Sequence, residues 1–270
     1  MRIVCDIGGT NMRVAAVAGE ALGDARKVPT PKDPAEGVAM FAALARECAG
    51  KEAIGRIAGC VAGMVSDEGV ISDARNLRAW EGINIVRELS NALGASADIV
   101  NDAACAGMGE GYAGAGKGAK RLAYLTVSTG VGGALIVDGE IAAAGGVAGI
   151  KIGDEELEDL ISGTAIRKRF GVDPRDLDSL EIREGLADTL AEGLRIVVEE
   201  WSPDMIVLGG SMITGVNPIP FSRAQESLYK SRGEANSPII KKAELGDSGG
   251  LWGGIARLKR LSEHSSTSAT

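Results

Sequence analysis

The chain has 270 residues, of which 45% are hydrophobic and 3% aromatic, and it carries a net charge of −8. This length suffices for one large domain or for two small ones that each have a core. The acidic charge argues against a surface for nucleic acid or anionic membrane, and no apolar stretch is long enough to span a bilayer. We therefore expect no nucleic-acid partner and no membrane partner.

Cysteine and histidine usage restricts the chemistry further. The cysteines Cys5, Cys48, Cys60 and Cys105 are scattered without a C-x-x-C pair, which indicates buried thiols and a cytoplasmic location. The sole histidine, His264, lies in a Ser/Thr-rich C-terminal tail that we expect to be disordered. Carboxylates are therefore the candidates for a general base near neutral pH.

Hydrophobic patterning, together with the positions of glycine and proline, predicts the elements in chain order. The first half contains strands at 2–7, 12–18 and 24–28, a helix at 34–49 opened by Pro34, strands at 54–60 and 69–72, a helix at 82–93, a strand at 97–101 and a helix at 103–112. After a glycine-rich hinge at 107–118, the second half contains strands at 121–127, 132–138 and 140–144, helices at 154–169 and 180–200, a strand at 204–209 and a last helix at 249–262. Each half is thus expected to be a mixed sheet flanked by helices, an α/β fold.

The segment Ile3–Asn11 leads an apolar strand directly into an acid, two glycines and a threonine. Gly8 and Gly9 permit a turn that a residue with a Cβ adopts with difficulty, and Thr10 adds a hydroxyl donor, so we expect a hairpin tip that presents donors to phosphate. Asp6 projects an anionic oxygen toward the same place, where Mg²⁺ could use it. For this segment taken alone, an ordinary glycine hairpin is the better explanation.

A second loop of the same design is Ser128-Thr129-Gly130-Val131-Gly132-Gly133, which again lies between two apolar strands. It is neither a P-loop nor a dinucleotide fingerprint, because no G-K-[ST] occurs and no G-x-G-x-x-G opens a helix. Two such hairpins, about 120 residues apart, predict a duplicated fold that grips one phosphate chain from both sides.

A polar pair, Asn101 and Asp102, follows a strand between the two loops. Either residue could simply cap the helix that begins there. However, the order of glycine loop, N-D pair and glycine loop resembles the ROK family of sugar kinases within the actin-like phosphotransferases. Nearly the whole chain carries the resemblance, through the further segments Gly59–Gly63, Gly69, Asn76-Leu77, Ser162–Ile166, Leu208–Ser211 and Asp247–Ala256.

The resemblance implies a two-lobed actin-like (ribonuclease H-like) fold, in which duplicated mixed sheets are flanked by helices and the active site lies in an interlobe cleft. It implies an N-terminal lobe of residues 1–108 completed by 250–265, a C-terminal lobe of residues 109–249, and a disordered tail at 266–270. It further implies a small-molecule sugar as substrate, ATP with Mg²⁺ as phosphoryl donor, and a homodimer.

The family pattern also implies roles for individual residues. Asp102 is the general base that accepts the proton of the sugar hydroxyl, and Asp6 orients the hydration shell of Mg²⁺. The other expected nucleotide-binding residues are Gly8, Gly9, Thr10, Asn11, Thr129, Gly130, Gly132, Gly133, Gly209 and Gly210. The expected sugar-side residues are Gly63, Asn76, Asn101, Asp102, Lys151, Asp154 and Glu158.

Some of these positions have simpler explanations. A helix-packing turn explains Gly209 and Gly210 nearly as well as a contact with adenosine. Arg13 and Asp138 are interpreted as surface charges of the hairpins.

The chain departs from the family pattern at the usual zinc site. Many ROK kinases hold a structural Zn²⁺ through a histidine and several cysteines located between the second glycine loop and the S-G-T-A-I segment. Here the interval 145–160 contains neither histidine nor cysteine. Because tetrahedral zinc sites rely on those ligands, no structural zinc is expected.

A second departure concerns the sugar. Relatives that phosphorylate glucose or N-acetylhexosamines show A-G-E-x-G-H, whereas residues 148–154 read A-G-I-K-I-G-D. Without a gap, Ile150 and Gly153 replace the Glu and the His; shifted by one residue, Lys151 and Asp154 do, while Glu158 matches a third sugar-contacting acid.

Two interpretations of Lys151 remain open. It could pair with a nearby acid such as Asp154, at the spacing that lets neighbours meet on a helix, or it could favour an anionic substrate. We expect a neutral hexose or amino-hexose kinase, with a sugar acid such as 2-keto-3-deoxygluconate as the alternative substrate.

Two alternatives belong to other classes of protein, namely a catalytically silent sugar-binding regulator and an actin-like ATPase without a sugar acceptor. ROK repressors carry a helix-turn-helix ahead of the D-I-G-G-T strand, and here that strand begins at residue 2, so no such module is expected. The Asn101-Asp102 pair favours a kinase over an ATPase.

Overall fold

The structure is a computed structural model that describes residues 1–267, with side chains described through residue 263. Contacts group the chain into two compact units, of which unit 1 comprises Met1–Tyr112 with Asp247–Thr270 and unit 2 comprises Ala113–Gly246. Of the expected tail at 266–270, residues 266–267 belong to the last helix and residues 268–270 lie outside the described part, as does the side chain of His264. Among the described residues, no helix is both long enough and apolar enough to cross a membrane.

Unit 1 is built on a mixed sheet with the strand order β3-β2-β1-β5-β8, in which β4 also pairs with β2. Its strands are β1 (Arg2–Ile7), β2 (Asn11–Ala18), β3 (Ala21–Leu22), β4 (Arg26–Pro29), β5 (Arg56–Val61) and β8 (Ser96–Asn101), with a separate hairpin of β6 (Met64–Val65) and β7 (Ile71–Ser72). Strand β1 is antiparallel to β2 and parallel to β5, and β5 is parallel to β8. Parallel neighbours need crossover connections, which the helices of this unit supply.

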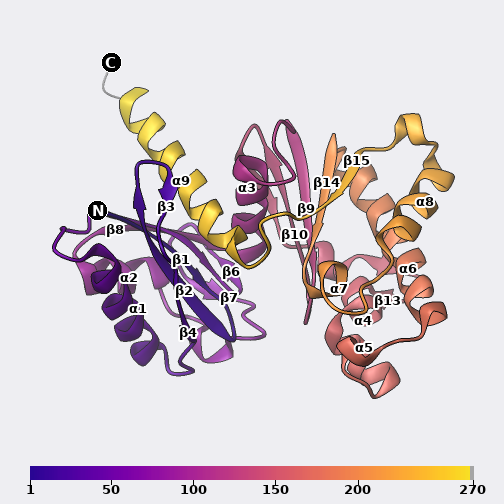
Figure 1. Cartoon of the computed structure of the whole chain (residues 1–270), viewed down its shortest axis with the longest axis horizontal. Helices are drawn as coiled ribbons and strands as arrows, with labels where there is room; N and C mark the ends of the chain where they lie inside the picture. The colour runs from indigo at the N-terminus through magenta and orange to yellow at the C-terminus, as the bar shows by residue number, and fades with distance from the viewer. Residues whose placement is uncertain (268–270) are drawn as a thin grey trace. The chain divides into compact units, whose positions relative to one another are not determined.

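The helices of unit 1 cover both faces of its sheet. They are α1 (Pro34–Ala49), α2 (Ile85–Leu93), α3 (Asp102–Ala113) and α9 (Gly249–Thr267), with a 3₁₀ turn at Arg78–Trp80. Side chains alternate along β1, so Ile3 and Ile7 join the core that contains Phe41 of α1, whereas Val4 packs with Ile255 of α9. Helix α9, at the yellow end of the chain, therefore packs on one face of a sheet whose first strands come from the indigo end (Figure 1).

Unit 2 repeats the strand order of unit 1, as β11-β10-β9-β14-β15. Its strands are β9 (Arg121–Val127), β10 (Val131–Val137), β11 (Glu140–Ala144), β14 (Met205–Gly209) and β15 (Ile239–Lys242), with a small hairpin of β12 (Lys151–Ile152) and β13 (Glu155–Glu156). In each unit a central strand pairs antiparallel with the next strand along the chain and parallel with a later one. The duplicated mixed sheet expected from the two glycine hairpins is therefore confirmed.

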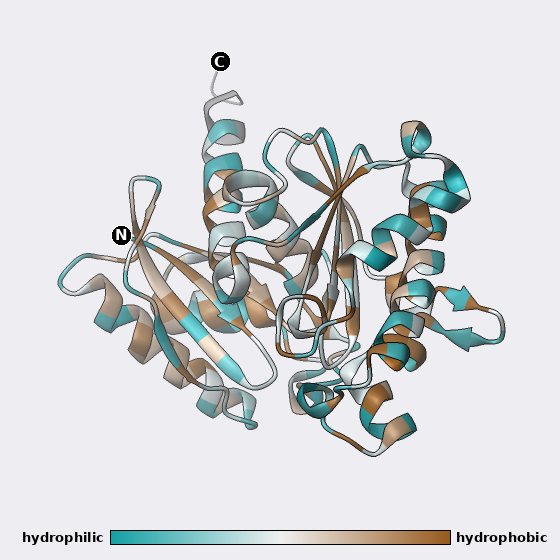
Figure 2. Ribbon diagram, turned by 45° about the vertical axis from the view of Figure 1, so that its right-hand side comes forward, coloured by the Kyte–Doolittle hydropathy of each residue, from teal (hydrophilic) through white to brown (hydrophobic). Residues whose placement is uncertain are grey.

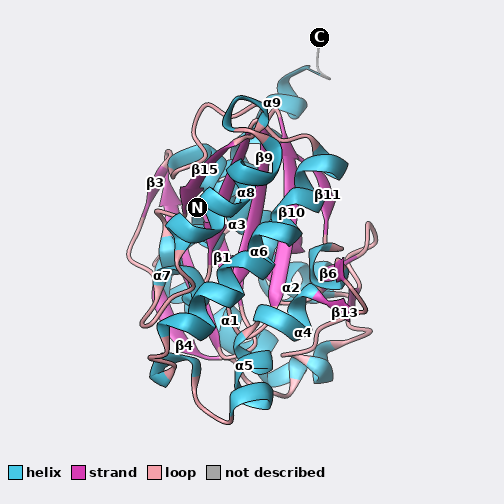
Figure 3. Cartoon of the chain, turned by 90° about the vertical axis from the view of Figure 1, so that its right-hand side faces the viewer, coloured by secondary structure: helices cyan, strands magenta, loops and turns pink. Residues whose placement is uncertain are grey.

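The helices of unit 2 are α4 (Leu157–Ile161), α5 (Gly163–Phe170), α6 (Leu180–Trp201), α7 (Ser211–Thr214) and α8 (Phe221–Arg232), with 3₁₀ turns at Val147–Gly149, Pro174–Asp176 and Glu234–Asn236. A further 3₁₀ turn, Gly246–Ser248, lies where the chain passes from unit 2 back to unit 1. Helices α6 and α8 lie side by side (Figure 3), and Leu190, Leu194 and Leu228 bury their side chains in the core shared with the sheet. The strands of the five-stranded sheet are largely hydrophobic, while the helices carry hydrophilic residues on part of their surface (Figure 2).

The predicted single helix at 154–169 is wrong. The chain first forms the β12–β13 hairpin, whose turn includes Gly153 at φ +61°, and then two helices separated by Ser162. Ser162 is extended, and its hydroxyl accepts the Ala165 N–H at 3.0 Å, so it caps α5. The Gly163 N–H bonds to the Ser128 carbonyl at 2.7 Å, a long-range contact that no local pattern reveals.

Other boundaries follow local signals more closely. Helix α1 begins at Pro34 as predicted, because Asp33 accepts the Glu36 N–H at 2.9 Å and proline suits the first helical turn. Helix α2 begins at Ile85, three residues later than predicted, because Asn84 caps it. Helix α8 and strand β15 were not predicted, although the paired prolines at 218 and 220 do precede α8 in a loop.

Candidate active site

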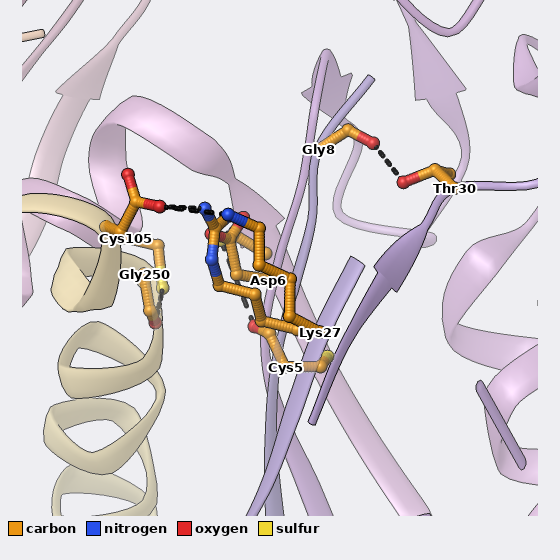
Figure 4. A network of polar contacts seen from close by, with 10 residues as sticks. Cys5, Asp6, Gly8, Lys27, Thr30, Cys105 and Gly250 are labelled. Carbon is orange, nitrogen blue, oxygen red and sulfur yellow. Dashed lines mark hydrogen bonds and ion pairs between the residues drawn. The ribbon is translucent and has the colours of Figure 1, made fainter. Parts of the chain in front are cut away.

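The candidate residues fall into two groups, one in each unit, and each group has its own geometry. In unit 1 the turn between β1 and β2 is closed by the Gly8 N–H, which bonds to the Asn11 carbonyl at 3.0 Å. The Thr30 hydroxyl donates to the Gly8 carbonyl at 2.7 Å (Figure 4), and Lys32 Nζ donates to the Gly9 carbonyl at 3.0 Å. These two side chains fix the turn by donating hydrogen bonds to its backbone carbonyl groups.

Gly9 is required by close packing and not by a left-handed backbone, since its φ is not in the positive range. A Cβ on Gly9 would lie 2.5 Å from the Cβ of Asn76, a contact that ordinary side chains never make. Asn76, an expected sugar-side residue, therefore lies directly against the first glycine loop. Thr10 is exposed, and Asn11 is half-buried at the start of β2.

Cross-strand pairing aligns the charged groups of unit 1. Asp6 is paired with Arg13 across β1 and β2, and Arg13 is paired with Lys27 across β2 and β4. Arg13 Nη1 lies 3.3 Å from the Asp6 carboxylate, its Nη2 pairs with Asp247, and Lys27 Nζ lies 3.4 Å from the same Asp247 oxygen (Figure 4). Opposite charges on directly opposed residues stabilise a sheet.

The interpretation of Arg13 as a surface charge is therefore wrong. Its side chain is 15% exposed, and it links Asp6 to the segment that precedes α9. The signal was present in the sequence, because a tight hairpin centred between Gly9 and Thr10 places Asp6 opposite Arg13. The role of Asp247, by contrast, depends on a contact between distant parts of the chain.

The environment of Asp6 disfavours a free negative charge. Burial raises the pKa of Asp6, while the Arg13 guanidinium and a hydrogen bond from Cys60 oppose that rise. The Cys60 thiol donates to Oδ1 of Asp6 at 3.6 Å, a weak bond from a buried group. Both carboxylate oxygens of Asp6 thus already have a protein contact, which suits binding of a metal ion through its hydration shell.

Asn101 is the residue that caps α3. Its Oδ1 accepts the Ala104 N–H at 3.0 Å, and its Nδ2 donates to the Gly63 carbonyl at 2.9 Å and to Asp102 Oδ1 at 3.1 Å. Gly63 has φ +119°, and a Cβ there would lie 2.9 Å from Ala74, so the expected sugar-side segment is tied to the start of the helix by close packing. The simple capping explanation thus accounts for Asn101, although not for Asp102.

Asp102 is a half-buried carboxylate held in one orientation. Oδ1 accepts the Ala103 N–H at 2.8 Å in addition to the bond from Asn101. Burial raises the pKa of Asp102 to about 6, with a further increase from the nearby charge of Asp6, while the hydrogen bonds from Ala103 and Asn101 act in the opposite direction. A carboxylate with this pKa is ionised at neutral pH yet basic enough to accept a proton during a reaction.

In unit 2 the second glycine loop joins β9 to β10 as a hairpin. Gly133 allows close packing, because a Cβ there would lie 2.5 Å from Val147 Cγ2, and Gly132 is paired with Thr126 at the start of β10. Residues of α4 and α5 contact the tip of the loop, where Thr164 Oγ1 donates to the Thr129 carbonyl at 2.7 Å. The loop is therefore held by its own unit.

Gly209 and Gly210 also have a packing explanation. A Cβ on Gly209 would lie 2.6 Å from the Tyr124 hydroxyl, and one on Gly210 would lie 2.2 Å from the Val127 carbonyl. Gly210 has φ +88°, a conformation that favours glycine. A role for this pair beside adenosine stays a prediction.

Lys151 does pair with a nearby acid, but the expected partner Asp154 and the expected helical spacing are wrong. Lys151 lies on β12 opposite Glu156 of β13, and its Nζ is 3.3 Å from the Glu156 carboxylate. Asp154 is exposed in the hairpin turn. Because the Lys151 side chain is 59% exposed, its ion pair contributes little to stability.

We expect the purified protein to contain no stoichiometric zinc. The interval that carries the family's zinc ligands is here the β12–β13 hairpin followed by α4, and its sequence has neither cysteine nor histidine. The measurement is elemental analysis of protein purified without added metal. One zinc per chain would contradict the expectation.

Two sheets share one strand order, each contains a glycine-rich hairpin, and a half-buried carboxylate lies at a helix start. Together these features define the actin-like phosphotransferase class. The model of the ROK family matches residues 2–260, so the chain belongs to the ROK family.

Among its relatives, it is 30% identical to the bifunctional enzyme NanE/NanK of Brucella suis over 92% of this chain and 51% of that enzyme. It is 29% identical to the fructokinase of Zymomonas mobilis over 66% of this chain and 67% of that enzyme. The structure of a ROK hexokinase from Thermus thermophilus superposes with a TM-score of 0.82 and 24% identity, covering 97% of this chain and 99% of that one.

Proposed function

We propose that this protein transfers the γ-phosphoryl group of MgATP to a hydroxyl of a neutral hexose or amino-hexose, with Asp102 as the general base. The chain is an ATP-dependent carbohydrate kinase of the ROK family. The observation that carries the finer proposal is the half-buried Asp102 carboxylate, which two donors hold in place and whose pKa is raised to about 6.

Phosphoryl transfer of this kind depends on positioning and on stabilisation of charge. The Ala103 N–H and the Asn101 amide keep Asp102 Oδ1 in one orientation, so that the carboxylate can take the proton of an acceptor hydroxyl. The backbone amides of Gly8–Thr10 and of Thr129–Gly133 are the proposed donors to the phosphates, and the proposal requires both loops to reach the same nucleotide. A net charge of −8 means that such local donors must hold the polyanion.

The residues of unit 1 fit a hydrated Mg²⁺. Asp6 provides hard oxygen atoms beside the first glycine loop, and Arg13 and Cys60 fix the orientation of its carboxylate. When bound there, Mg²⁺ would neutralise charge that develops on the phosphates.

The contacts of Lys151 support a neutral sugar. Its ammonium group already has a carboxylate partner in Glu156 and is mostly exposed, which is a poor arrangement for a buried contact with a sugar acid. The loss of the family's Glu and His leaves the identity of the hexose open to experiment.

We expect a substrate panel to select a neutral sugar. The panel contains glucose, mannose, fructose, their N-acetylamino counterparts and 2-keto-3-deoxygluconate, assayed by coupled ATP turnover. Lys151→Ala should change kcat/KM for the preferred sugar by less than about threefold, because the ammonium group pairs with Glu156 at an exposed position and the proposal gives it no contact with a neutral sugar. Phosphorylation of the sugar acid alone, abolished in Lys151→Ala, would instead establish the alternative substrate.

The same assay, run with and without sugar, distinguishes the proposed kinase from an actin-like ATPase and from a silent regulator. Sugar-independent ATP hydrolysis at a comparable rate would indicate an actin-like ATPase. Absence of turnover with every sugar, together with sugar binding, would indicate a catalytically silent regulator.

A further inference from the structure

The tip of the second glycine loop is held by one short segment of unit 2, residues 158–164. The Gly163 N–H donates to the Ser128 carbonyl at 2.7 Å, and the Thr164 N–H donates to the Thr129 carbonyl at 3.1 Å. The Glu158 carboxylate accepts the Val131 N–H at 2.8 Å. Consecutive residues of the loop therefore have partners within this segment.

Glu158 is the one charged side chain among these contacts. Its Oε2 atom occupies the space beside Gly130, where a Cβ would lie 2.7 Å away. Glycine at 130 thus permits the approach of this carboxylate. The same oxygen, Oε2 of Glu158, therefore accepts the hydrogen bond from Val131 and packs against Gly130.

The hydrogen bond to Glu158 satisfies a backbone donor, the Val131 N–H, that strand pairing does not. Strand β11 pairs with β10 only from Ala134 onward, and the Gly145 N–H donates a hydrogen bond to the Gly133 carbonyl. The Val131 N–H therefore lies beyond the end of that ladder, where a donor needs another partner. A carboxylate is a strong acceptor for such an N–H, because charge-assisted hydrogen bonds are about twice as strong as neutral ones.

We propose that Glu158 is a positioning residue for the second glycine loop, so that one carboxylate connects sugar recognition with nucleotide binding. The inference rests on the proposed function, and on the sugar contact that the family pattern implies for Glu158. It goes beyond that assignment because it makes the affinity for nucleotide depend on Glu158 even when no sugar is present. A loop held in its binding geometry before the nucleotide arrives loses less entropy on binding.

The first test needs no ligand. Hydrogen–deuterium exchange of the peptide containing residues 128–133 should be at least about tenfold faster in Glu158→Ala, because the partner of the Val131 N–H is removed. Glu158→Gln retains an oxygen acceptor and should stay within about threefold of the unsubstituted protein. Asp159→Ala, which removes an exposed carboxylate from the same helix, is the matched control and should leave the exchange unchanged.

The second test measures the dissociation constant of a non-hydrolysable ATP analogue with Mg²⁺ in the absence of sugar. We expect Glu158→Ala to raise it about tenfold, and Glu158→Gln by less than about threefold. Thr164→Val, which removes the hydroxyl bond to the Thr129 carbonyl at 2.7 Å, should raise it by a smaller factor and provides the test if Glu158→Ala does not fold.

The outcomes distinguish this inference from the proposed function. If Glu158→Ala raises only the KM for sugar and leaves exchange and nucleotide affinity unchanged, Glu158 is a sugar ligand alone and the inference is overturned. If exchange rises in Glu158→Ala but no sugar in the panel is phosphorylated, the loop contact stands and the proposed function fails.

Discussion

Asp102→Asn is expected to lower kcat by roughly two or more orders of magnitude, the usual contribution of a general base. Asparagine keeps the shape and can still accept the Ala103 N–H, which bonds to Asp102 Oδ1 at 2.8 Å, so nucleotide binding should be retained. The measurement is steady-state turnover with the preferred sugar, together with the affinity for an ATP analogue. Asp24→Asn, an exposed change, is the control, and near-normal turnover in Asp102→Asn would remove Asp102 from the mechanism.

The pH dependence follows from the same residue. Because the pKa of Asp102 is about 6, kcat/KM should fall about tenfold for each pH unit below that value and level off above it. The acid limb of the kcat/KM profile reports the pKa of the general base in the free enzyme. An acid limb near pH 4, the ordinary range of an aspartate, would contradict the buried environment of Asp102.

Asp102→Asn should also stabilise the fold at neutral pH. The pKa of Asp102 is raised from 3.8 to about 6, and one pKa unit corresponds to about 1.4 kcal/mol, so the ionised carboxylate destabilises the folded state by about 3 kcal/mol. A raised carboxyl pKa means that the folded state binds the proton more tightly, and stability therefore falls as pH rises from about 4 to about 6. The gain from Asp102→Asn should be complete above pH 6 and absent below pH 4, as measured by thermal unfolding.

Gly253→Ala is expected to destabilise the protein by about 3 kcal/mol, at the upper end of the usual cost of overpacking. Gly253 lies in α9, and a Cβ there would lie 1.9 Å from the Cys105 carbonyl of α3. Gly109 of α3 makes the reciprocal approach, with a Cβ position 2.3 Å from the Gly249 carbonyl. The two helices thus touch backbone to backbone, and a methyl group would force them apart.

Gly185→Ala is the matched control for Gly253→Ala. Gly185 also lies in a helix, α6, but nothing is within 4 Å of its Cβ position. Alanine there should raise stability by up to about 1 kcal/mol, because glycine is the poorer helix former. Urea denaturation of both variants measures the difference, and equal midpoints would show that α9 can shift at no cost. A displaced α9 should also lower activity, since Gly250 of the same helix packs against Asp6.

Local chemistry in the sequence predicted much of the frame. The pair Gly8-Gly9 predicts a tight turn, and in the structure this turn connects β1 to β2 in a hairpin. Asp33 and Pro34 supply a helix start that depends on neighbouring residues alone, and α1 begins there. The single predicted helix at 154–169 failed because Ser162 and Gly163 direct their polar groups to other partners, including Ser128 in the distant second loop.

The sequence by itself determined the family, the paired glycine hairpins and Asp102 as the residue to test, because short motifs and hydrophobic alternation depend on neighbours in the chain. Only the tertiary structure decided which charges meet. Arg13 contacts Asp247 across 234 positions of sequence, and Lys151 turns to Glu156 because a hairpin replaces the expected helix. The pKa of Asp102 likewise arises from burial and from Asp6, which folding brings near it. Burial and long-range pairing depend on how the whole sheet is assembled, and no local pattern specifies that.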